Sequence, residues 1–118
     1  LYNYWLAKNR ISETSTIILV EGQGDVWRLW EAGIKNAVGI FGCNLTDFQL
    51  IKIEKSGALN IVVMTDNDEA GKKASKNIRD KCERLFNMYY PTLESKDVGD
   101  MSVEDINQYL KPQLDGVI

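Results

Sequence analysis

The stretch Asn60-Ile-Val-Val-Met-Thr-Asp-Asn-Asp-Glu-Ala-Gly-Lys-Lys-Ala74 gives the strongest indication of the fold. Its first part, Ile61 to Met64, is apolar at every position, which predicts a strand buried on both faces, as in a parallel sheet covered by helices. The run leads to two acids, Asp66 and Asp68, whose i and i+2 spacing directs them to the same side in extended backbone. The carboxyl end of a buried strand is the place where open α/β sheets bind ligands.

The pair Asp66 and Asp68 has two interpretations that these residues alone leave open. Two carboxylates held together repel each other unless one is protonated or a cation bridges them, and oxygen ligands of this kind suit Mg²⁺ or Mn²⁺. Asp is also common in turns and at helix N-termini, so the same residues can simply end a strand and begin a helix. The rest of the sequence has to decide between a metal site and a turn.

A second predicted strand also ends in acids. Thr16 to Val20 is a run of β-branched and aliphatic residues, and it is followed by Glu21-Gly22-Gln23-Gly24-Asp25. If this strand is a parallel neighbour of the one that precedes Asp66, then Glu21 lies close to Asp66 and Asp68. Asp25 stands at the start of a helix, so a capping role competes with a functional one there.

The remaining segments alternate between helix and strand patterns. Helices are predicted over residues 25–33, 46–55, 69–87 and 102–110, and two further strands over 37–41 and 89–93. Four strands that alternate with helices predict an α/β domain with a mostly parallel, Rossmann-like sheet, covered by helices on both faces. Three large apolar side chains of these helices are expected in the core: Trp27, Trp30 and Leu85.

A third acidic turn follows the last predicted strand and contains Asp97 and Asp100. Three strand ends on one edge of the sheet therefore carry acids, which favours the metal site. Basic residues crowd the helix that begins after the second of these turns: Lys72, Lys73 and Lys76. Most such runs are solvated helix faces. This one begins beside the proposed cation site, which favours contact with phosphate groups.

Composition narrows the possible chemistry. The chain has 118 residues, enough for one domain, and a net charge of −3, which excludes a globally basic nucleic-acid binder. It contains no histidine, which excludes histidine general bases, Ser-His and Cys-His pairs and the usual zinc ligands. Any catalysis must therefore depend on carboxylates, lysines, arginines, hydroxyls or a metal ion.

The cysteines and the ends of the chain give expectations about location and organisation. Cys43 and Cys82 lie in no metal-ligand spacing, so a cytoplasmic protein with reduced, inert thiols is expected. No apolar run reaches the length of a membrane span, and no membrane partner is expected. The aromatic-rich residues 1–15 are expected to form a lead-in segment from a neighbouring subdomain, and residues 16–118 to form the domain itself.

The strand ends resemble the Toprim family, whose signature is a strand ending in Glu-Gly with an Asp shortly after, and a later strand ending in Asp-x-Asp. Here these are Val20-Glu21-Gly22-Gln23-Gly24-Asp25 and Thr65-Asp66-Asn67-Asp68. The resemblance extends from about Thr16 to Leu110 and implies the Toprim fold. Within the family, the amino-acid sequence is similar to that of replicative DNA primases of bacteria and phages. The similarity is clearest in Asp66-Asn67-Asp68-Glu69-Ala70-Gly71-Lys72-Lys73-Ala74 and Lys96-Asp97-Val98-Gly99-Asp100.

This resemblance implies metal-dependent nucleotidyl transfer that makes RNA primers on a single-stranded DNA template. It implies the following roles: Glu21, Asp66 and Asp68 as catalytic residues, the same three with Asp97 as ligands of Mg²⁺ or Mn²⁺, Asp25 and Asp100 as supporting acids, and Lys72, Lys73 and Lys76 as phosphate contacts. The implied partners are template DNA, ribonucleoside triphosphates and a replicative helicase in cis or in trans, with a phage source favoured over a bacterial one. The isolated fragment is expected to prime little or not at all.

Three other functions stay open at this stage. A Toprim-type nuclease would use the same acids to activate water instead of a hydroxyl group. A non-catalytic Toprim module would not depend on Asp66 or Asp68. A phosphoacceptor receiver domain would need an acidic pair after the first strand, which Glu21-Gly22 does not provide.

Overall fold

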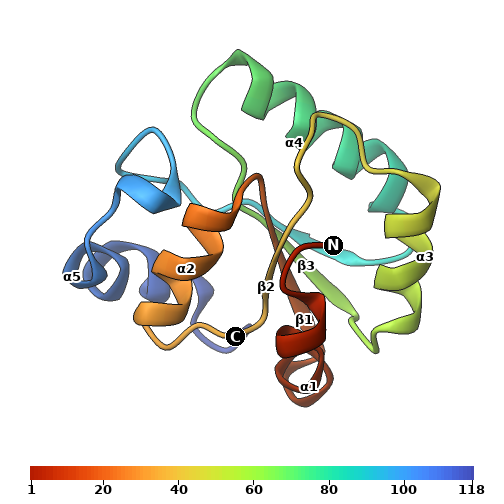
Figure 1. The fold of residues 1–118 in the computed structure, drawn as a ribbon, viewed down its shortest axis with the longest axis horizontal. Coiled ribbons are helices and arrows are strands. Elements are labelled where there is room, and N and C mark those ends of the chain that lie inside the picture. The colour runs from red at the N-terminus through yellow and green to blue at the C-terminus, as the bar shows by residue number, and fades with distance from the viewer.

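Four parallel strands form the centre of the structure, a computed structural model that describes residues 1–118. They are β1 (Thr16–Val20), β2 (Ala37–Gly39), β3 (Asn60–Val63) and β4 (Asn87–Tyr89), in the order β2-β1-β3-β4 across the sheet (Figure 1). All three strand pairs are parallel. The predicted four-stranded parallel α/β sheet is confirmed.

The two central strands explain why their sequences are continuously apolar. In the pairing of β1 with β3, Ile18 lies beside Val62 and Leu19 beside Val63. Successive side chains of a strand point to opposite faces. Accordingly Ile18 and Val62 belong to one hydrophobic core, while Leu19 and Val63 belong to a second core on the other face.

Helices cover both faces of the sheet, as predicted (Figure 1). The first core includes residues of α2 (Gln23–Glu31) and of the C-terminal segment. The second core includes residues of α1 (Tyr4–Thr14), α3 (Asp47–Lys55) and α4 (Glu69–Cys82). The C-terminal segment is built from four short helical elements: η1 (Val98–Asp100), α5 (Val103–Asp105), η2 (Ile106–Leu110) and η3 (Lys111–Leu114). No helix is both long and apolar enough to cross a bilayer.

Local signals in the sequence set several helix ends. The backbone amide of Gln49 donates to the hydroxyl of Thr46 over 3.1 Å, and the Thr46 amide donates to the Gln49 side chain over 2.9 Å, so these two residues form a capping box at the start of α3. Gly33 follows α2 with a φ of 85°, a left-handed conformation that favours glycine. At α4, Asp68 is the N-cap residue, and its side chain accepts a hydrogen bond from the Gly71 amide over 2.7 Å.

The last strand lies earlier than predicted, and the helix before it is shorter. Helix α4 ends at Cys82 instead of continuing to residue 87, and Leu85 is 61% exposed instead of buried. The strand forms at Asn87–Tyr89, where it pairs with β3, and not over residues 89–93. The helix ends early because the chain must turn after Cys82 to bring Asn87 beside Asn60. The strand does not continue through Pro91 because proline has no amide hydrogen to donate to the neighbouring strand.

The prediction that Trp27 and Trp30 lie in the core is wrong. Trp27 is 55% exposed and Trp30 is 37% exposed, while Val26 and Leu29 are buried. Each Trp directly follows one of these buried residues, and one helical position is a turn of about 100° away from the sheet. The Trp27 indole nitrogen instead donates to the hydroxyl of Tyr2 over 2.9 Å.

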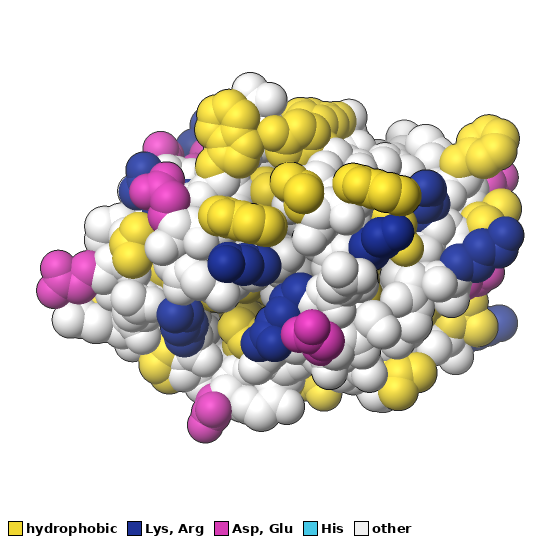
Figure 2. Space-filling view, turned by 60° about the horizontal axis from the view of Figure 1, so that its bottom comes forward, with side chains coloured by type: hydrophobic (Ala, Val, Ile, Leu, Met, Phe, Trp, Pro, Cys, Tyr) yellow, Lys and Arg dark blue, Asp and Glu magenta, His cyan; other side chains and the backbone are white.

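The N-terminal segment packs on the sheet. Ala7 and Ile11 of α1 are fully buried, and Tyr2 makes an antiparallel bridge to Gly39 at the end of β2. Trp5 remains 76% exposed. Figure 2 shows apolar side chains gathered along one face together with Lys and Arg side chains. That residues 1–15 belong to a neighbouring subdomain stays a prediction.

A candidate metal centre at the sheet edge

Two of the predicted acids lie at the carboxyl ends of the two central strands. Glu21 directly follows β1, and Asp66 follows β3 after two further residues. Because β2 lies on one side of β1 and β3 on the other, the strand order reverses between β1 and β3. Ligands of open α/β sheets bind at such a switch point. The amide of Asp66 donates to Oε1 of Glu21 over 3.1 Å, so the two strand ends are in direct contact.

Asp25, in the first turn of α2, reaches the same point from the helix. Its carboxylate accepts hydrogen bonds from the amide of Gly22 over 3.2 Å and from the amide of Gly99 over 2.9 Å. Only 7% of Asp25 is exposed. The carboxylate therefore both supports the start of α2 and holds the Gly99 loop in place.

Asp97 comes from the C-terminal segment, directly before η1. Its Oδ1 accepts a hydrogen bond from the Asp100 amide over 2.8 Å. A Cβ atom built on Gly99 would lie 3.1 Å from the nearer oxygen of Asp25 and 3.3 Å from that of Asp97. A side chain at this position would require the two carboxylates to shift by a few tenths of an ångström, so glycine favours their present arrangement.

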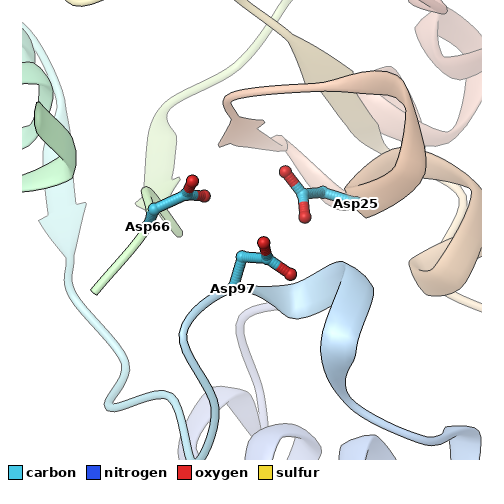
Figure 3. A group of neighbouring side chains, drawn as sticks. All are labelled: Asp25, Asp66 and Asp97. Carbon is cyan, nitrogen blue, oxygen red and sulfur yellow. The ribbon is translucent and has the colours of Figure 1, made fainter. Parts of the chain in front are cut away.

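The structure thus brings three carboxylates from three distant segments together. One oxygen each of Asp25, Asp66 and Asp97 lies within 4.8 Å of the others, and Figure 3 shows the three side chains directed toward a common point. They lie in a cavity of about 580 Å³ lined by these residues: Glu21, Gly22, Gly24, Asp25, Phe41, Gly42, Asp66, Asp97, Gly99 and Asp100. The cavity is dominated by acids and glycines.

Burial, together with crowding of negative charge, raises the pKa of two carboxyl groups in the centre. Burial, and after it the negative charges of Glu21 and Asp25, raise the pKa of Asp66 from 3.8 to about 7. Burial also raises the pKa of Asp25, although hydrogen bonds from the Gly99 and Gly22 amides act in the opposite direction. A cation bound among these carboxylates would offset their mutual repulsion and favour their charged forms.

The donor set suits a hard divalent cation. Carboxylate oxygens are the ligands of Mg²⁺ and Ca²⁺, and two oxygens that bind one Ca²⁺ at about 2.4 Å are at most about 4.8 Å apart. Mg²⁺, with bonds of about 2.1 Å, needs a closer approach or water molecules as further ligands, which it commonly keeps. Asp25, Asp66 and Asp97 are the residues that could hold such an ion.

Asp68 does not join these three carboxylates. Its side chain caps α4 through Gly71, and its other oxygen lies 3.9 Å from the ammonium group of Lys96. It is also absent from the residues that line the acidic cavity, whereas Glu21 and Asp100 are among them. A ligand role for Asp68 stays a prediction, as do the roles proposed for Glu21 and Asp100.

The predicted basic residues differ in position. Lys72 lines a second cavity of about 260 Å³, which shares Asp66 with the acidic one. Lys76 forms an ion pair with Asp80 at 2.9 Å, and Lys73 is exposed. Phosphate contact by any of the three stays a prediction.

The sequence does not identify three of the residues that line the acidic cavity: Gly99, Phe41 and Gly42. Gly99 directly precedes Asp100 and Gly22 directly follows Glu21, so a glycine beside an acid is a usable signal. The sequence predicts Phe41 at the end of a strand, and nothing in its sequence context indicates that its side chain leaves the core. Only the tertiary structure places it at the cavity.

Comparison with known proteins agrees with this geometry. The Toprim domain profile matches residues 15–88 of the chain. A DNA primase of Enterococcus faecalis is 30% identical over 112 residues, which are 95% of this chain and 16% of that protein. The chain therefore spans about a sixth of the length of this relative, and 14% of the length of a Chlamydia pneumoniae DNA primase that it also matches.

Solved structures share the fold. The zinc-binding and RNA polymerase domains of the Aquifex aeolicus primase superpose with a TM-score of 0.72 at 29% identity, covering 98% of this chain and 28% of that one. The RNA polymerase domain of Mycobacterium tuberculosis primase DnaG, in complex with a double-stranded DNA oligomer with a 6-nucleotide overhang, has a TM-score of 0.75 at 21% identity, covering 96% and 38%. The resemblance to the Toprim signature is confirmed, and with its acidic edge of a four-stranded parallel sheet this chain belongs to the Toprim domain family.

Proposed function

We propose that this chain is the catalytic Toprim domain of a DNA primase, which makes RNA primers on single-stranded DNA during replication. The observation that carries the proposal is the meeting of Asp25, Asp66 and Asp97 in one cavity, in a chain whose relatives are named DNA primase. Nucleotidyl transfer needs cations beside the reacting phosphate, and this chain has no histidine to serve as a base or ligand.

The acids would have different roles in metal binding and proton transfer. Asp25, Asp66 and Asp97 would hold Mg²⁺ or Mn²⁺, which when bound neutralises charge on the triphosphate and lowers the pKa of a primer 3′ hydroxyl. Glu21, whose carboxylate accepts a hydrogen bond from the Asp66 amide, would orient that residue and accept the hydroxyl proton. Asp68 and Asp100, at the border of the centre, would add negative charge that attracts the cation.

The basic start of α4 would meet phosphate groups. Lys72 is the best placed of the three lysines because its cavity also contains Asp66 and the hydroxyl side chains of Thr65 and Ser75. Hydroxyls and an ammonium group are donors that suit a triphosphate or a template backbone. Lys73 and Lys76 would act more weakly, as charges on the outer face of the helix.

The partners follow from the reaction. A structural relative is described in complex with DNA, and template DNA and ribonucleoside triphosphates are the substrates we propose here. A replicative helicase in cis or in trans, a phage source and a cytoplasmic location remain predictions.

Product analysis of the parent protein, the full-length primase in which we propose that this chain is one domain, tests the proposal. The parent is incubated with single-stranded template, labelled ribonucleoside triphosphates and Mg²⁺, with Asp66→Asn as the inactive control. We expect short oligoribonucleotides from the natural sequence and at least about a hundredfold less from the variant. Template cleavage without new oligoribonucleotides would instead identify a Toprim nuclease, and activity that survives Asp66→Asn would point to a non-catalytic module.

A further inference from the structure

Phe41 is the one apolar side chain among the residues that line the acidic cavity. It follows β2, and it is 60% exposed. Large apolar side chains on a protein surface need no explanation when they are scattered singly. An aromatic ring that forms part of the wall of a charged cavity is a different case, because the ring restricts what can bind beside the acids.

Two backbone features and one ring contact define the position of Phe41. Its backbone has a φ of 50°, a left-handed conformation that is uncommon for a residue of this size. Its amide donates to the carbonyl of Glu21 over 2.9 Å, which ties it to the end of β1. Its ring packs edge-on against Tyr2, with centroids 5.5 Å apart and planes at 72°.

Tyr2 is itself fixed. It exchanges two backbone hydrogen bonds with Gly39, of 2.9 and 3.0 Å, and its hydroxyl accepts a hydrogen bond from the Trp27 indole over 2.9 Å. The exposed ring of Phe41 is thus supported by Tyr2, which in turn contacts Trp27, and neither of these two residues lines the cavity. Strained backbone that its surroundings hold in place is found mostly at ligand-binding positions.

We infer that Phe41 is a stacking platform for a nucleobase whose phosphate lies at the acidic centre. This inference rests on the proposed function, because it assumes that the cation held by the acids attracts a nucleotide phosphate. A nucleobase presents a flat π-face, and aromatic side chains stack on such faces with little regard to sequence. Phosphate, cation and base would then be recognised by neighbouring parts of one cavity, and Phe41 acts as a positioning residue.

Binding to pairs of ligands with and without a base tests the inference in the 118-residue chain. The first pair is a short oligothymidylate and an abasic strand of equal length, and the second is ATP and inorganic tripolyphosphate, all with Mg²⁺ and followed by NMR titration. Phe41→Ala should weaken binding of a base-bearing ligand about tenfold, the range of one lost base stack. Binding of its base-free counterpart should change less than about twofold.

Two variants serve as controls. Phe41→Tyr keeps an aromatic ring and should bind like the natural sequence, and unfolding curves confirm that each variant is folded. Phe48→Ala removes an aromatic ring that is 85% exposed on α3, outside the acidic cavity, and should change nothing. If Phe41→Ala weakens binding of the oligothymidylate, the base belongs to a DNA strand. If it weakens binding of ATP, the base belongs to a free nucleotide.

The inference fails if Phe41→Ala weakens base-bearing and base-free ligands equally, or if it weakens neither pair. It also fails if the natural chain shows no preference for the ligand with a base. These measurements report binding and not synthesis, so failure of primer synthesis by the parent would overturn the proposed function without changing their outcome.

Discussion

The pKa of Asp66 differs strongly between the folded and the unfolded chain. Its pKa rises to about 7 because of burial and the neighbouring acids, whereas in the unfolded chain it has its ordinary value of 3.8. Between these values the native state holds a proton that the unfolded chain releases. The stabilisation is therefore complete below about pH 4 and is lost as the pH rises through 7.

We predict that this proton makes the metal-free protein lose stability as the pH rises. Because Asp66 is only partly buried, solvent screening reduces the effect to about 1 kcal/mol. Urea unfolding at pH 5 and pH 8 should show that loss in the natural chain relative to Asp66→Asn, which has no proton to release. The same pH dependence in both proteins would contradict the assignment.

At Phe41, we predict that a glycine variant is more stable than an alanine variant, which is the reverse of the usual order. A protein with glycine in a helix or strand is normally less stable than one with alanine by about 0.5–1 kcal/mol, because glycine gives the unfolded chain more conformational freedom. A left-handed backbone conformation, however, costs an L-residue about 1–2 kcal/mol. With a φ of 50°, Phe41→Gly should unfold at higher urea concentration than Phe41→Ala. At Phe48, within helix α3, the glycine variant should be the weaker one.

Asp68 allows a separation of two roles at one residue. Asn caps helices about as well as Asp, so Asp68→Asn keeps the hydrogen bond to the Gly71 amide while it removes a charge. From the observed geometry we expect Mn²⁺ affinity to fall less than about threefold by calorimetry, against about tenfold or more for Asp25→Asn. A loss as large as that of Asp25→Asn would show that Asp68 moves into the coordination sphere.

At the scale of elements, the start of α4 sets the position of Asp66. Gly71 packs so tightly against the preceding loop that an added Cβ atom would overlap the carbonyl oxygen of Asp66 and lie 2.6 Å from its carbonyl carbon. The helix and the acidic loop can keep their present spacing only because residue 71 has no side chain. The positions of α4 and of the metal centre are therefore coupled.

We predict that Gly71→Ala destabilises the protein by about 1–3 kcal/mol, the cost of overpacking, and weakens Mn²⁺ binding because Asp66 must move. The matched control is Gly24→Ala in α2, where a Cβ atom would meet nothing within 4 Å. That change should stabilise the chain by about 0.5–1 kcal/mol, the usual gain of alanine over glycine in a helix. Urea unfolding of both variants checks the contrast in stability, and calorimetry of Gly71→Ala with Mn²⁺ checks the loss of binding. Equal stability of the two variants would disprove the steric argument.

At the scale of the whole molecule, the metal centre joins β3, α2 and the C-terminal segment, which are far apart in sequence. A ligand that binds only the folded state stabilises it by mass action, by about 2.7 kcal/mol at a hundred times its Kd. A cation at this centre should therefore stabilise the fold as a unit, including the segment that carries Asp97.

Mn²⁺ should accordingly raise the Tm of the natural chain by several degrees, in proportion to the logarithm of its concentration. Asp97→Asn should lose most of this shift. Asp115→Asn, which removes an exposed acid outside the cavity, should keep it. Equal Tm shifts in both variants would mean that the ion binds elsewhere.

Much of the fold could be predicted because its signals are local. The continuous apolar runs of β1 and β3 are visible in the sequence, as are the capping residue Thr46 and the left-handed Gly33. The acids at the strand ends could be grouped as well, because parallel strands bring their carboxyl ends to one edge of a sheet. Each of these inferences depends only on neighbours in the chain and on the general geometry of strands and helices.

What the sequence by itself determined is therefore the α/β class, the acidic edge and the Toprim resemblance. Only the tertiary structure decided which acids meet: it placed Asp25 and Asp97 with Asp66, turned Asp68 toward the Gly71 amide, and brought Phe41 to the cavity wall. The reason is that these outcomes depend on where α2 and the C-terminal loop come to rest against the sheet. That placement is set by packing and by the hydrogen bond from the Gly99 amide to Asp25. Neither of them produces a periodic pattern that could be recognised in the sequence.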